Sequence, residues 1–70
     1  MVTQAEMSLR IKEANKYLSS IRNSEKRRYA YEYWGFRRGI MNYPIDGQFK
    51  LGTMAKQAVR LRMNEIMNWD

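Results

Sequence analysis

The sequence contains no cysteine and no histidine. Disulfide bonds, thiolate and imidazole metal sites, and the Ser-His and Cys-His nucleophile pairs of many enzymes are therefore excluded. A chain without cysteine fits the reducing cytoplasm, and we expect this protein to be cytoplasmic. No apolar run approaches the roughly 18 residues of a membrane span, and no signal-like segment opens the chain, so we expect no membrane partner.

Common catalytic patterns are also missing. The sequence holds no P-loop, no GxGxxG and no GxSxG motif. Its carboxylates are scattered, whereas acid–base catalysis uses pairs with contrasting environments. We therefore expect a protein that is not an enzyme and has no metal and no cofactor. The scattered carboxylates are Glu6, Glu13, Glu25, Glu32, Asp46, Glu65 and Asp70.

The composition, with 44% hydrophobic and 29% charged side chains, is typical of one folded domain, which we expect to span residues 1–70. One core of this size rarely supplies more than about 3 to 5 kcal/mol of stability. Because disulfides and Cys/His metal sites are excluded, a weak homodimer is an alternative source of stability. Thirteen Lys and Arg against seven Asp and Glu give a net charge of +6, which favours nucleic acid or an acidic protein surface as partner.

The first half of the chain predicts two helices joined by a tight corner. Thr3 and Glu6 form a capping box, and apolar residues then recur at intervals of three and four, which predicts a helix over residues 4–21. A corner is expected at 22–24, where Asn23 or Ser24 would cap a second helix over 25–41; a single long helix through this region is the alternative. The apolar residues of the first helix are Met7, Ile11, Ala14, Leu18 and Ile21.

The second half predicts a turn and a third helix. Gly35 and Gly39, four residues apart inside the second helix, suggest close packing on one face or an early end of the helix near residue 35. The segment from Pro44 to Gly47 predicts a turn or a small ribbon, and Thr53 would cap a helix over 54–68 with a broad apolar arc and an Arg62–Glu65 pair. The fold class is therefore mainly α, a compact three-helix domain. The arc comprises Met54, Ala55, Ala58, Val59, Leu61, Met63, Ile66 and Met67.

Two opposite stripes along the second helix carry its aromatic residues. At about 100° per residue, one stripe is the predicted core face, and it comprises Tyr29, Tyr33, Phe36 and Ile40. The other stripe alternates guanidinium and aromatic groups and is predicted to be exposed; it comprises Arg27, Tyr31, Trp34 and Arg38, with Lys26, Arg28 and Arg37 around it. A second polar stripe is interpreted as a solvated face that could extend a phosphate-binding surface; it comprises Lys56, Arg60 and Asn64 with Gln57.

The exposed stripe suits a phosphate-bearing partner, because arginine forks bind phosphate oxygens and aromatic faces stack on bases. We therefore expect a small basic DNA-binding or other nucleic-acid-binding protein. One alternative is that Tyr31 and Trp34 are covered by another helix, with arginine stems at the rim. The other is a protein-interaction module, a small inhibitor or adaptor such as a phage accessory protein, because Trp, Tyr and Arg also dominate interface hot spots.

Overall fold

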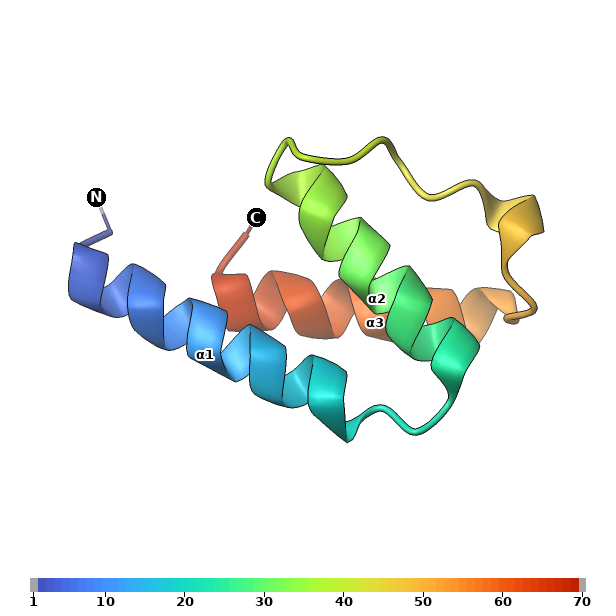
Figure 1. Ribbon diagram of the computed structural model, residues 1–70, viewed down its shortest axis with the longest axis horizontal. Coiled ribbons are helices and arrows are strands. Elements are labelled where there is room, and N and C mark those ends of the chain that lie inside the picture. The colour runs from blue at the N-terminus through green and yellow to red at the C-terminus, as the bar shows by residue number, and fades with distance from the viewer. Residues whose placement is uncertain (1, 70) are drawn as a thin grey trace.

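Three helices make up most of the protein, as the sequence predicts. The computed structural model describes residues 2–69, with α1 at Gln4–Ser20, α2 at Ser24–Arg37, a 3-10 turn at Asp46–Gln48 (η1) and α3 at Thr53–Met67 (Figure 1). No strand forms within residues 2–69, so the loop between α2 and α3 has a turn and no ribbon. In the same range, no helix is both long and apolar enough to cross a membrane.

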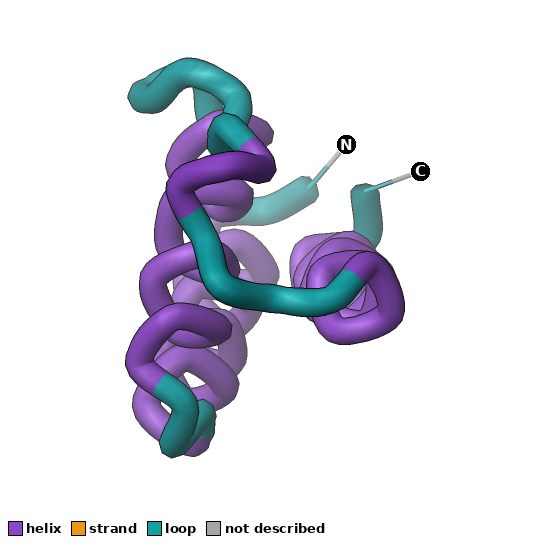
Figure 2. The backbone as a smooth tube through the Cα atoms, turned by 90° about the vertical axis from the view of Figure 1, so that its right-hand side faces the viewer, coloured by secondary structure: helices purple, strands orange, loops and turns teal. Residues whose placement is uncertain are grey.

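The helices form two layers. Figure 2 shows α3 end-on, to one side of α1 and α2, and residues 49–52 crossing to it from the layer of α2. The radius of gyration is 12.1 Å, slightly above the roughly 11 Å expected for a compact chain of this length. The amino-terminal end of α1 extends beyond α2 and α3 in Figure 1. Met7, which the sequence assigned to the core seam, is consequently exposed.

Side-chain caps fix the first two helices. The Thr3 hydroxyl accepts a hydrogen bond from the Glu6 amide at 3.1 Å, and Asn23 Oδ1 accepts from the Glu25 and Lys26 amides at 2.9 and 3.1 Å. Each bond satisfies an amide that has no partner inside the helix. The predicted Thr3 and Asn23 caps are thus confirmed, and the corner occupies residues 21–23, one residue earlier than predicted. The predicted Thr53 cap is wrong, because the helix begins one residue earlier with Gly52 as its N-cap.

The second helix ends four residues earlier than predicted. Gly39 has a φ of +78°, the Gly39 amide donates to Phe36 O at 3.0 Å, and the Ile40 amide donates to Gly35 O at 2.9 Å. This pair of bonds is the Schellman termination, in which glycine adopts the left-handed conformation. Gly39 therefore lies outside the helix, and the face that it was predicted to share with Gly35 does not exist. Gly35 is packed closely, since a Cβ there would lie 2.8 Å from Met41 Sδ.

Replacing Gly39 should test this termination. Gly39→Ala is expected to lower the free energy of unfolding by about 1 kcal/mol, because an L-residue is strained at positive φ. Gly47→Ala is the matched control: an added Cβ meets no atom within 4 Å at either position, and Gly47 has no positive φ. Urea unfolding of both variants measures the difference. Equal stability of the two variants would contradict the role given to Gly39.

The core is built from all three helices and from two residues outside them, Ile21 and Phe49. Half of the predicted α2 core stripe is buried, namely Tyr29 and Tyr33. Ile40 is 65% exposed because α2 ends before it, and Phe36 lies at the surface. On α3 the apolar arc is narrower than predicted, and Met54, Ala58 and Leu61 are exposed. The buried apolar set is Ala14, Leu18, Ile21, Tyr29, Ala30, Tyr33, Trp34, Phe49, Val59, Met63 and Met67.

Polar residues of α3 anchor the tyrosines of α2. Arg60 Nη1 donates to the Tyr29 hydroxyl at 2.8 Å, and the Tyr33 hydroxyl donates to Asn64 Oδ1 at 2.7 Å. Burial raises the pKa of Tyr29 above its usual value, although the hydrogen bond and charge of Arg60 act against the shift. Lys56 is also buried. The interpretation of Lys56, Arg60 and Asn64 as a solvated face is therefore wrong. Arg60 and Asn64 face α2 because each buried tyrosine hydroxyl needs a polar partner.

Candidate binding groove

A groove runs along the side of α2 that faces away from its tyrosine contacts with α3. Its volume is about 920 Å³, and it lies between the end of α1, the first half of α2 and residues 41–48 of the loop. Its lining comprises Asn15, Leu18 and Ser19 from α1, Ser24, Arg27, Arg28, Tyr31 and Glu32 from α2, and Met41, Asn42, Tyr43, Ile45 and Gln48 from the loop.

The structure brings three of the predicted site residues into this groove: Arg27, Arg28 and Tyr31. Tyr31 is 54% exposed, as predicted. Arg27 Nη1 donates to Ile21 O at 2.9 Å, which caps the carboxyl end of α1 and holds the guanidinium beside it. A guanidinium has five N–H donors, so this bond leaves Arg27 able to bind a partner.

Trp34 is not part of the groove. It is only 4% exposed and belongs to the core, so the prediction of an exposed Trp34 is wrong and the alternative reading of a covered Trp34 holds. The physical reason is that α2 packs against both α1 and α3. These two contacts bury a larger part of the helix circumference than the single core stripe that was predicted. Arg38 lies at the rim, with its guanidinium carbon 4.9 Å from the Trp34 ring centroid.

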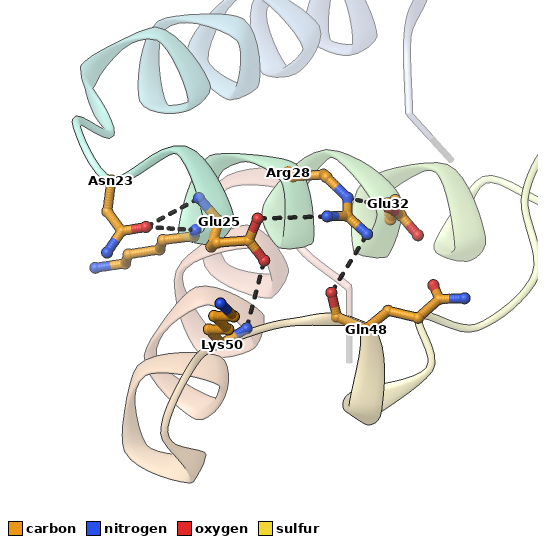
Figure 3. A network of polar contacts seen from close by, with 7 residues as sticks. Asn23, Glu25, Arg28, Glu32, Gln48 and Lys50 are labelled. Carbon is orange, nitrogen blue, oxygen red and sulfur yellow. Dashed lines mark hydrogen bonds and ion pairs between the residues drawn. The ribbon is translucent and has the colours of Figure 1, made fainter.

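Arg28 is held in a network that ties α2 to the loop (Figure 3). Its guanidinium pairs with Glu25 at 3.4 Å and with Glu32 at 3.3 Å, and donates to Gln48 O at 3.4 Å. The Lys50 amide donates to the second Glu25 oxygen at 3.4 Å. Two carboxylates therefore compensate the charge of Arg28, and the same contacts fasten the loop that forms one wall of the groove.

The remaining predicted site residues lie elsewhere. Arg37 Nη1 contacts the Tyr33 hydroxyl at 3.1 Å and Asn64 Oδ1 at 3.3 Å, on the side of α2 that faces α3. Lys26 is half-buried and does not line the groove. The secondary candidates Lys56 and Arg60 belong to α3, where Lys56 is buried and Arg60 contacts Tyr29 of α2. The seven-residue patch inferred from the sequence is thus divided between two sides of α2.

Sequence reasoning missed the loop wall of the groove. Met41, Tyr43 and Ile45 are all exposed there, and the Tyr43 ring packs edge-on against Phe36 with centroids 4.9 Å apart. A signal was present, because loops are ordinarily polar and this one carries several large apolar side chains directly after the helix-ending Gly39. The sequence alone could not show that the loop returns alongside α2.

The groove offers aromatic, aliphatic and guanidinium groups, which suit binding. No group of three or more acidic side chains that could hold a metal ion occurs among the described residues. Comparison with protein-family models, with curated protein sequences and with solved structures finds no match.

Proposed function

We propose that this chain is a non-catalytic protein-interaction module whose groove receives a segment of a larger protein. The observation that carries the proposal is the gathering of Tyr31, Tyr43 and Ile45, all exposed, in one cleft of about 920 Å³. Apolar and aromatic side chains gathered in a cleft beside a few polar groups are typical of binding sites. Tyr, Met and Arg are also the residue types enriched in protein interfaces and their hot spots.

Nucleic-acid binding is the second candidate. The net charge of +6 and the position of Arg27 beside the exposed Tyr31 favour it, since basic side chains bind phosphates and a tyrosine ring can stack on a base. Two observations weigh against it. Trp34, the larger stacking surface, is buried, and Arg28 is paired with two carboxylates that a phosphate would have to displace.

A capture experiment separates the two candidates. We expect the tagged chain to retain a protein from a lysate of its source organism after nuclease treatment, and Tyr31→Ser to lose it. Leu61→Ser is the matched control, because Leu61 is exposed to a similar degree, 61% against 54% for Tyr31, but lies on α3 outside the groove. Loss of the partner on nuclease treatment, with a steep dependence on salt, would favour nucleic acid instead. Retention by the Tyr31→Ser variant would contradict the groove as the binding site.

A further inference from the structure

The two walls of the groove differ in chemistry. The loop wall presents the apolar groups of Met41, Tyr43 and Ile45 beside Asn42 and Gln48. The α1 wall presents the polar side chains of Asn15 and Ser19 beside the buried Leu18. Residues three apart on a helix lie on the same face, so exposed Lys12 continues the α1 wall one turn before Asn15. A segment lying in the groove would therefore meet apolar groups on one side and polar or basic groups on the other.

Uncompensated positive charge lies on the α1 side. Among the described side chains, the ion pairs engage Arg28 with Glu25 and Glu32 but leave Arg27 and Lys12 without a carboxylate. Arg27 is held next to α1 by its bond to Ile21 O. An acidic side chain on the occupant would thus be attracted toward Arg27 and Lys12, and Glu32 would repel it from the opposite edge.

The size of the groove suits a helix. The groove follows α2 from Ser24 to Glu32, which is about 12 Å at roughly 1.5 Å per residue. That length accommodates about two turns of a helix, at about 5.4 Å per turn. A helix also satisfies its own backbone hydrogen bonds, and it meets a groove of side chains through residues at i, i+3, i+4 and i+7.

We infer that the occupant is an acidic amphipathic helix, with its apolar stripe against Tyr31 and the loop wall and its acidic edge along Arg27 and Lys12. This inference rests on the proposed function and adds the conformation and charge of the partner segment. It also predicts that the acidic residues lie on only one of the two flanks of the bound helix, the flank that faces Arg27 and Lys12.

A displayed peptide library tests the inference on the full chain. The peptides have about 14 residues, a length at which good helix formers begin to be stable, with large apolar residues at i, i+3, i+4 and i+7 and Asp, Glu, Lys or Ser on both flanks. We expect selected peptides to carry acids on one flank and to lose affinity for Tyr31→Ser. A central proline should abolish their binding.

Charge variants then locate the acidic flank. Arg27→Gln removes the positive charge but keeps a polar side chain, and it is expected to weaken binding of the selected peptide about tenfold, the effect of about 1.4 kcal/mol. Arg62→Gln, an ion-paired arginine of α3, is the control and should change nothing. The inference would be overturned if lysine appeared on both flanks as often as acids. It would also be overturned if binding survived the central proline; in both cases the proposed function stands.

Two other outcomes are decisive. If no selected peptide responds to Tyr31→Ser, the proposed function itself fails, and this inference fails with it. If a labelled single-stranded oligonucleotide displaces the selected peptide with a steep salt dependence, the basic edge serves nucleic acid and the inference is overturned.

Discussion

Trp34→Ala is expected to leave the chain largely unfolded at room temperature. The indole is 4% exposed within a core shared by all three helices. Truncating a buried Trp or Phe to Ala costs about 3 to 5 kcal/mol, and a core of this size supplies about 3 to 5 kcal/mol in total. Circular dichroism should show the loss of the helical spectrum, or a melting transition well below that of the parent.

Two variants control this result. Tyr31→Ala changes the residue one turn earlier, which is 54% exposed, and surface substitutions usually stay within about 0.5 kcal/mol. Trp34→Phe keeps most of the packing, and the indole N–H that it removes has no hydrogen-bond partner among the described residues. It should therefore lower the free energy of unfolding much less than Trp34→Ala does. Normal folding of Trp34→Ala would show that the indole is not a core group.

The helices could be predicted because their signals are local. The capping residues Thr3 and Asn23 act on amides two or three positions away, and the Arg62–Glu65 pair, predicted from i, i+3 spacing, forms at 2.7 Å. The spacing of Glu25, Arg28 and Glu32 carried the same kind of signal. It would have shown that the charge of Arg28 is compensated.

The candidate site was harder to predict because it depends on neighbours distant in the chain. Helical projection places Arg27, Tyr31, Trp34 and Arg38 on one stripe but does not say how many helices cover α2. Contact with both α1 and α3 buries Trp34 and leaves Tyr31 exposed. The left-handed Gly39 likewise redirects the chain, so that the following loop lies beside α2 and supplies the apolar wall.

Removing two apolar side chains from the groove is expected to abolish partner binding. Tyr31→Ser and Ile45→Ser lie on α2 and on the loop wall, and both residues are more than half exposed. A hot-spot residue contributes at least about 2 kcal/mol, and about 1.4 kcal/mol is tenfold in affinity. The double variant should therefore bind the captured protein roughly 700-fold more weakly or worse, the effect of about 4 kcal/mol, as measured by titration calorimetry. Its melting temperature should stay close to that of the parent.

The matched control removes two more exposed apolar side chains from α3. Met54 and Leu61 are 78% and 61% exposed and lie outside the groove, so the double variant Met54→Ser and Leu61→Ser should bind as the parent does. An equal loss in both double variants would indicate general hydrophobic adhesion instead of a defined site. Unchanged binding in the groove variant, with both proteins folded, would remove the groove from consideration, because an interface centred there must lose affinity when its anchors are truncated.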